Sequence, residues 1–300
     1  MTMMELGTLT TAEHFIMRNA RLLDRHRYAY HFLGGPAEPI RQVLDAYRNP
    51  DGGYGNALDP DLRGHRSQPV AVEAALRILD ELGPIPRPIA LDACRYLTGV
   101  TLDDGGVPPV TRSVRVSDAA PWWRERTDFG ARLAPTAAIA GLLHKHHVCH
   151  PWRDRATAFC WKRIGSLHWT DPVEAFAVCT FLAHAADRER AAAELARLRP
   201  MIRAVTQLTP DTEGRAHTPL DIVTSPDGTA GALFSSAEID RDLDALQARQ
   251  ESDGGWGHPG ESWCATADSD WRGLVTVQRL VTLRAFGCLT EGTAIYPRTA

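Results

Sequence analysis

The chain has 300 residues, of which 44% are hydrophobic and 23% charged, and its formal net charge at pH 7 is −4. This composition is typical of a globular protein, and the weak negative charge argues against a nucleic-acid-binding surface, which is usually strongly basic. The first residues lack the basic segment and apolar core of a signal peptide, and the longest apolar run, Ala134–Leu143, is shorter than the about 18 residues of a membrane span. We therefore expect a cytoplasmic protein with no transmembrane segment.

Helical periodicity dominates the chain from the first apolar segment onward. Between Ile40 and Tyr47, apolar residues recur at i, i+3, i+4 and i+7, and a second such segment follows with Ser67 as its N-cap and Gly83 as its stop. The same spacing predicts further helices in the segments 88–99, 133–146, 152–165, 171–186, 188–208, 239–246 and 270–287. No segment alternates in the manner of a β-strand, so the sequence predicts an all-α fold.

A glycine motif divides these helices into repeats. It reads NPDGGYG at Asn49–Gly55 and ESDGGWG at Glu251–Gly257, with a degenerate copy, TLDDGGVPP, at Thr101–Pro109. In each copy the glycines permit a turn that the aspartate caps, and in the two strong copies the aromatic ring fills space between helix pairs. Turn-rich breaks at 165–172 and 209–219 complete a spacing of roughly 50 residues, which is typical of a helical array. We expect one domain over residues 1–300, an α/α toroid of about five to six helix pairs, with an irregular loop at about 105–132.

The repeat resembles that of the terpenoid cyclase and protein prenyltransferase superfamily. RQESDGGWG, with Gln250, is similar to the QW motif of squalene–hopene cyclases, and RNPDGGYG has Arg48 in place of the glutamine. The first copy and its continuation also resemble short bacterial proteins labelled prenyltransferase-like or squalene-cyclase-like. The resemblance implies a toroid with a central apolar cavity and acid-initiated cyclisation or isomerisation of an isoprenoid or another lipophilic small molecule.

Two acidic pairs follow the two strong copies of the motif, Asp59 with Asp61 and Asp268 with Asp270. Class II terpenoid cyclases protonate an alkene or epoxide with an aspartic acid of a D-x-D-D motif. Here Leu62 and Trp271 stand at the position of the last aspartate. The resemblance implies that Asp268 and Asp270 are the acid and its partner, with Asp59 and Asp61 as the competing site. The alternative is that these carboxylates cap helix starts, where anions are favoured.

Aromatic and basic residues supply the other candidates for substrate binding. Ring faces stabilise cations, and the rings that we consider are Tyr28, Tyr30, Trp122, Trp123, Trp169, Trp263 and Trp271. Each of them also fits an ordinary core or surface position.

The basic candidates Arg63, His65 and Arg66 suit a diphosphate, or else form a solvated basic turn. No D-D-x-x-D motif is present, so a metal-dependent class I terpene synthase is not expected. No cofactor is required, and Mg²⁺ enters only if the substrate is a diphosphate.

A histidine- and cysteine-rich segment, HKHHVCHPW, is the remaining metal candidate. Its potential ligands are His144, His146, His147, Cys149 and His150. Zinc sites use such residues, and lanthionine cyclases, which share the toroid, bind zinc through two cysteines and a histidine, which would make Cys94 the partner of Cys149 and His150. The glycine-rich surroundings of those ligands are missing, and no histidine follows Cys264 as in protein prenyltransferases. We therefore expect no metal site.

Two other classes of function remain open from the sequence. One is a non-catalytic toroid that binds a hydrophobic ligand or peptide. The other is a sugar-processing enzyme, in which two carboxylates roughly 5–10 Å apart flank a polar groove. In the first hypothesis the partner is a hydrophobic small molecule, with peripheral membrane contact as an option and no nucleic acid.

Overall fold

The computed structural model describes residues 6–209, 217–226, 229–258 and 260–289. The regular elements of these residues are α-helices and two 3₁₀-helices, and the prediction of an all-α fold is confirmed. The chain divides into two compact units. The central unit is Asp45–Val205, and the terminal unit combines Met1–Leu44 with Thr206–Ala300. The closed ring concerns both units together and stays a prediction.

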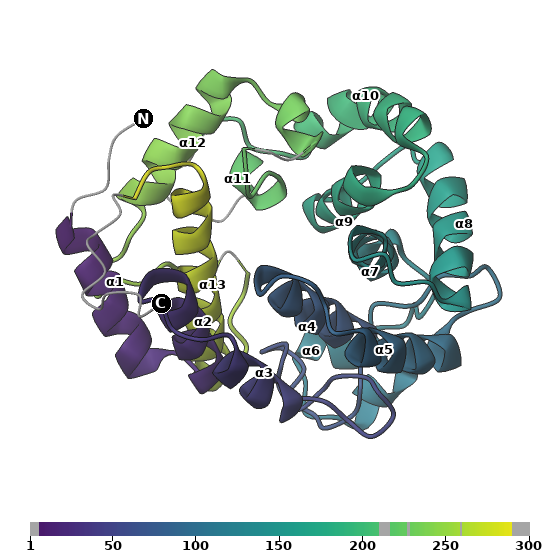
Figure 1. Cartoon of the computed structure of the whole chain (residues 1–300), viewed down its shortest axis with the longest axis horizontal. Helices are drawn as coiled ribbons and strands as arrows, with labels where there is room; N and C mark the ends of the chain where they lie inside the picture. Colours follow the sequence, from purple (N-terminus) through teal and green to yellow (C-terminus); the bar gives the residue numbers. More distant parts are fainter. Residues whose placement is uncertain (1–5, 210–216, 227–228, 259, 290–300) are drawn as a thin grey trace. The chain divides into compact units, whose positions relative to one another are not determined.

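The central unit consists of three helix pairs (Figure 1). They are α4 (Pro69–Glu81) with α5 (Arg87–Val100), α7 (Leu133–Lys145) with α8 (Pro151–Gly165), and α9 (Pro172–His184) with α10 (Arg188–Ala204). Helix α7 packs against α4, α8 and α9, while α5 packs against α8 and α10 against α9. The first helices of the pairs therefore form one layer and the second helices another, as in a helical array.

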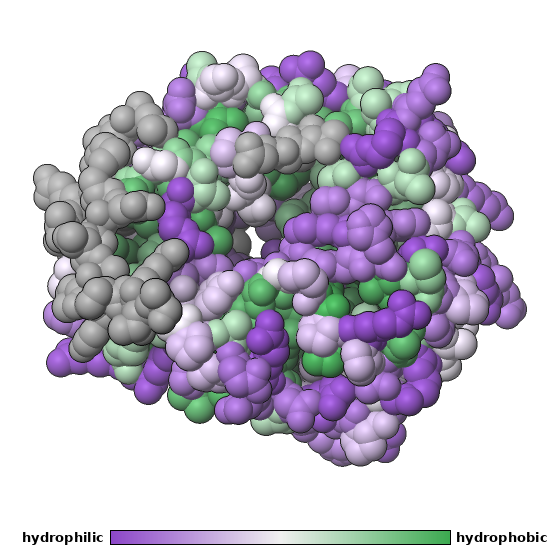
Figure 2. Space-filling model, viewed as in Figure 1, coloured by the Kyte–Doolittle hydropathy of each residue, from purple (hydrophilic) through white to green (hydrophobic). Residues whose placement is uncertain are grey.

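Helix α7 is the buried centre of this unit. Every residue from Pro135 to Leu143 is buried, which its apolar and small side chains permit on all sides of the helix. At Gly141, a Cβ atom would lie 2.6 Å from the backbone oxygen of Thr180, so the glycine allows α7 and α9 to approach closely. In the view of Figure 2, the surface over α7 and α9 is mostly hydrophilic. Over α4 and α5, hydrophobic residues are visible among the hydrophilic ones.

The terminal unit brings the two ends of the described chain together. Its helices are α1 (Leu6–Asn19), α2 (Leu22–Phe32), α3 (Glu38–Asp45, whose last residue belongs to the central unit), α11 (Pro219–Ile222), α12 (Ser236–Ala248) and α13 (Ala265–Ala285), with the 3₁₀-helix η2 (Thr229–Leu233). Helices α1, α2 and α13 pack on one another, and α11 packs on α12. An ion pair of 2.6 Å between Asp221 and Arg279 connects α11 to α13.

All three copies of the glycine motif form the same turn. In each, the aspartate Oδ1 accepts a hydrogen bond from the backbone N–H of the second glycine, at 2.8 Å for Asp51, 3.2 Å for Asp104 and 3.0 Å for Asp253. The first glycine has a φ of 90°, 95° or 94°, a conformation that favours glycine. A Cβ atom there would lie 2.2 Å, 3.0 Å or 2.2 Å from a backbone oxygen of the helix against which the turn packs, at Asp92, Arg155 or Thr11. The expected structural role of the motif is confirmed.

The segment 105–132 is irregular apart from η1 (Arg112–Val116) and the short helix α6 (Pro121–Arg124). It packs on the loop that follows the first glycine turn. A hydrogen bond from the N–H of Gly64 in this loop to the carbonyl oxygen of Asp118 joins the two at 2.8 Å. A small apolar cluster holds the two together and consists of Leu62, Val110, Val114, Ala119 and Phe129. No helix in the described part of the chain is both long and apolar enough to cross a bilayer.

Candidate functional site

The predicted site residues fall in both units, and each group is described by itself. The central unit contains Asp59, Asp61, Arg63, His65, Arg66, Trp122 and Trp123. The terminal unit contains Tyr28, Trp263, Asp268, Asp270 and Trp271.

The first acidic pair serves local structure. The Asp59 carboxylate accepts a hydrogen bond from the backbone N–H of Asp61 at 2.9 Å, and the Asp61 carbonyl accepts one from the N–H of Ala120 at 2.8 Å. Asp61 itself is only 8% exposed. The Asp59 carboxylate thus caps a turn of this loop and not a helix start, as the alternative had it, and the Asp61 carbonyl attaches the loop to segment 105–132.

The basic and aromatic candidates beside this loop lie toward the surface. His65 and Arg66 are exposed and Arg63 is half-buried. Trp122 is 40% exposed, and the Trp123 ring is already covered by the guanidinium of Arg126 at 5.6 Å from its centroid. A cation therefore already occupies one face of Trp123.

Tyr28, in the terminal unit, is a core residue. It is 1% exposed, its ring stacks on Phe32 at 5.1 Å, and its hydroxyl donates to the Glu13 carboxylate at 3.3 Å. Burial, and then the charge of Glu13, raises the pKa of Tyr28 well above its usual range. These contacts tie α2 to α1.

The second acidic pair is divided by the geometry of α13. Asp268 lies in the first turn of this helix, whose N-cap is Cys264, and Trp271 lies three residues further on. Side chains three apart share a helix face, whereas Asp270, two positions from Asp268, projects from a different face. The structure therefore groups Asp268 with Trp271 rather than with Asp270.

His258 joins this group and was not among the residues singled out from the sequence. Its ring stacks on Trp271, with the centroids 4.4 Å apart and the planes inclined by 17°. Burial lowers the pKa of His258, the carboxylate of Asp268 acts in the opposite direction, and His217 lowers it further. The imidazole is therefore mainly neutral at pH 7. We call His258, Asp268 and Trp271 the imidazole site.

A titratable residue just before α11 acts on the imidazole site. His217, whose charge acts on His258, lies 3.7 Å from the carboxylate of Asp221, which pairs with Arg279. In the loop before α13, the indole N–H of Trp263 is buried and has no hydrogen-bond partner among the described residues. A buried N–H of this kind usually has an acceptor, so Trp263 can donate to a bound molecule.

The histidine- and cysteine-rich segment of the central unit does not assemble a metal site. His144 pairs with Thr157 at 2.8 Å, His146 with Asp80 at 2.7 Å, and the His150 ring accepts the backbone N–H of Trp152 at the start of α8. Cys149 is exposed, while burial raises the pKa of Cys94 to about 12. No group of three or more His, Cys, Asp or Glu side chains suited to a metal ion occurs in the described ranges.

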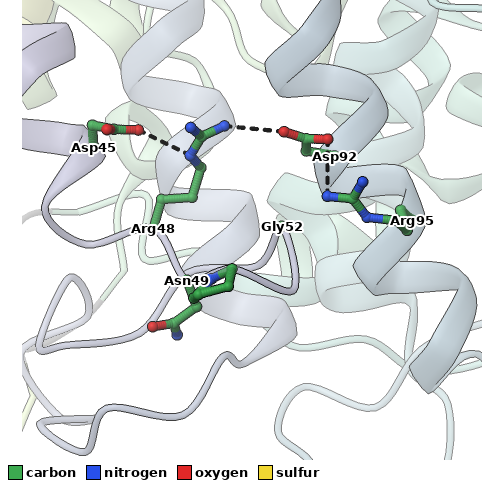
Figure 3. Close-up of a pocket in the computed structure, with 7 residues that line it drawn as sticks. Asp45, Arg48, Asn49, Gly52, Asp92 and Arg95 are labelled. Atoms are coloured by element: carbon green, nitrogen blue, oxygen red, sulfur yellow. Dashed lines mark hydrogen bonds and ion pairs between the residues drawn. The ribbon is translucent and has the colours of Figure 1, made fainter.

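An open pocket of about 220 Å³ borders the first glycine turn (Figure 3), lined by Asp45, Arg48, Asn49, Pro50, Gly52, Asp92 and Arg95. Its charges pair with one another. Arg48 bridges Asp45 at 2.9 Å and Asp92 at 3.1 Å, and Arg95 also binds Asp92. These pairs connect the turn to α5 and leave little uncompensated charge for a ligand.

The residues that sequence reasoning missed carried a weak signal. His258 stands two positions after the aromatic residue of the second glycine motif and ten before Asp268. Nothing in that spacing predicts the stack on Trp271, because the loop between the motif and α13 has no regular period.

Comparisons with known proteins give the fold alone. No family model matches the chain, and no curated protein matches it. A solved structure described as a protein from Actinoplanes is similar with a TM-score of 0.58 and 17% sequence identity, over 94% of this chain and 99% of that one. At this identity the likeness extends to the fold and to no activity.

Proposed function

We propose that the protein is an enzyme that isomerises a lipophilic small molecule by proton transfer at the imidazole site. The observation that carries the proposal is the stack of a half-buried, neutral imidazole on Trp271, with the carboxylate of Asp268 close enough to alter the pKa of that imidazole. A carboxylate and a neutral imidazole in different environments are a typical acid–base pair.

The position of Asp268 favours isomerisation over alkene protonation. Asp268 lies in the first turn of α13, a helix of 21 residues, and helix N-termini are where negative charge is stabilised. A terpenoid cyclase of class II needs a carboxylic acid that keeps its proton. A carboxylate beside an imidazole suits the removal of a proton instead, so the cyclase resemblance supports the fold and the lipophilic substrate more than the cyclisation step.

The neighbouring groups fit this chemistry. Trp271 provides an apolar wall, and a positioned acid or base contributes about 10²–10⁴ in rate. Proton transfer requires no redox cofactor or metal, and Mg²⁺ enters only if the substrate carries a diphosphate.

Incubation in D₂O with a panel of linear isoprenoid hydrocarbons, alcohols, ketones and diphosphates tests the proposal. We expect a rearranged or deuterated product by mass spectrometry, and its loss in Asp268→Asn and His258→Gln. His168→Gln, at an exposed histidine of the central unit, is the matched control and retains the activity.

Absence of any product or deuterium across the panel contradicts the proposal. A lipid that copurifies with the protein without being converted then supports the non-catalytic binding hypothesis. Turnover of oligosaccharides in a parallel panel supports the sugar-processing hypothesis.

A further inference from the structure

One hydrogen bond to the His258 ring indicates which ring nitrogen carries its hydrogen. The backbone N–H of Gly260 is directed at Nδ1, at 3.4 Å. A backbone N–H can only donate, so Nδ1 is the acceptor. The neutral ring therefore carries its hydrogen on Nε2, and none of the described residues hydrogen-bonds to Nε2.

Gly260 lies close to this edge of the ring. A Cβ atom at residue 260 would lie 2.5 Å from Nε2 and 2.8 Å from Cε1 of His258. Any residue except glycine would therefore displace the imidazole from this position. Glycine at position 260 therefore keeps the imidazole, and with it the Nε2–H donor, in this position.

An N–H donor of this kind requires a lone pair on its partner. A neutral imidazole donates to an oxygen that gains negative charge during a reaction and keeps its own proton while doing so. A hydrocarbon has no such acceptor. The N–H donor of His258 and the carboxylate of Asp268 together match a carbonyl compound with a hydrogen on the carbon next to the carbonyl.

Building on the proposed function, we propose that the substrate is a lipophilic ketone or aldehyde and that the site forms its enolate. Asp268 removes a proton from the carbon next to the carbonyl, and the electron pair of the broken C–H bond forms a C=C bond. The C=O electrons move onto the oxygen, which accepts a hydrogen bond from His258 Nε2. Asp268 then returns the proton to the same carbon or, in an unsaturated ketone, to the far end of the conjugated system, which moves the double bond.

Hydrogen exchange in D₂O tests this inference with two probes of similar size, the isoprenoid ketone geranylacetone and the hydrocarbon β-farnesene. We expect deuterium next to the carbonyl of geranylacetone, above the protein-free rate, and none in β-farnesene. Asp268→Asn and Gly260→Ala each lower the exchange by about 10-fold or more. Gly99→Ala, where a Cβ atom meets open space, is the matched control and retains it.

The outcomes separate the inference from the proposed function. Conversion of β-farnesene without exchange in geranylacetone overturns the carbonyl inference and leaves proton-transfer isomerisation in place. No reaction with either probe, or with the wider panel, contradicts both.

A second measurement does not depend on turnover. Nitrogen-15 NMR of the full-length protein, with His258→Gln used for assignment, reports the tautomer of His258 at neutral pH. We expect the hydrogen on Nε2. A hydrogen on Nδ1 overturns the inference whatever the activity.

Discussion

The two strong glycine turns have the same backbone but lead into different surroundings. After the turn at Asp51–Gly53, the following loop uses Asp59 to bind its own backbone and packs under segment 105–132. After the turn at Asp253–Gly255, the loop places His258 against Trp271 of α13, beside Asp268. A repeated motif thus determines the architecture, and the residues after it determine whether a chemical site can form.

The turns also differ in how their preceding residue is used. Gln250 donates to the carbonyl of Gly254 at 2.8 Å and so completes its own turn. Arg48, at the equivalent position, reaches to Asp45 and Asp92 instead (Figure 3). Ion pairs thus connect the first turn to α5 through Arg48, whereas the second turn is connected to α13 through Arg272, which pairs with Glu251 at 2.6 Å and with Asp253 at 2.9 Å.

Alanine at the first glycine of either turn gives the largest expected effect. In Gly52→Ala and Gly254→Ala the new Cβ atom lies 2.2 Å from a backbone oxygen at positive φ, and we expect a loss of about 3 kcal/mol in the free energy of unfolding. Urea denaturation measures it. Gly83 also has a positive φ but faces open space, so Gly83→Ala measures the cost of the backbone conformation without a clash. We expect it to lose about 1 kcal/mol in the free energy of unfolding. Equal losses at all three positions contradict the packing role of the turns.

Neutralising one carboxylate after each turn compares the two loops directly. We expect Asp268→Asn to lower turnover by about 100-fold, because it removes the proposed base. Asp59→Asn retains turnover, because its amide oxygen can still accept the backbone hydrogen bond of Asp61. Steady-state kinetics with the substrate found in the panel checks both variants. If Asp59→Asn loses more turnover than Asp268→Asn, the catalytic carboxylate lies in the first loop and the imidazole site is not the active site.

The pH dependence of stability distinguishes the second loop. Burial lowers the pKa of His258 in the folded state, so between that value and the unfolded value near 6.5 the unfolded chain binds more protons. Stability therefore falls as the pH drops below about 7, by less than about 1 kcal/mol because the ring is partly solvated. Chemical denaturation of the wild type and His258→Gln between pH 5 and 8 measures this difference. Parallel pH profiles of the two proteins contradict it.

Exchanging the preceding residue gives the smallest effect. In Arg48→Gln the ion pairs with Asp45 and Asp92 are lost at a side chain that is 30% exposed, so we expect a loss of about 0.5 kcal/mol that shrinks as salt is added. Thermal unfolding at low and high salt measures it, with Arg95→Gln as a control that removes only one of the pairs to Asp92. If the stability lost in Arg48→Gln is the same at low and high salt, it comes from the packing of the Arg48 side chain and not from its ion pairs.

The sequence by itself determined the glycine turns and most of the helices, although α1 and α2 were not predicted. Apolar spacing at i, i+3 and i+4 marks a helix wherever one face is buried, and positive φ at the glycine positions is a local requirement that the residue type satisfies. The degenerate copy at Asp104–Gly106 was identified on this basis, and its turn has the same hydrogen bonds as the two strong copies.

Only the tertiary structure decided the partners of the polar side chains. Asp268 and Asp270 are neighbours in the sequence, yet the helical period directs them apart, and His258 reaches the imidazole site through a loop with no period at all. The histidines of the segment 144–150 likewise separate to Thr157, Asp80 and a helix start. Local pattern follows from backbone geometry, whereas contacts between side chains distant along the chain depend on how the helices pack, which no short stretch of sequence encodes.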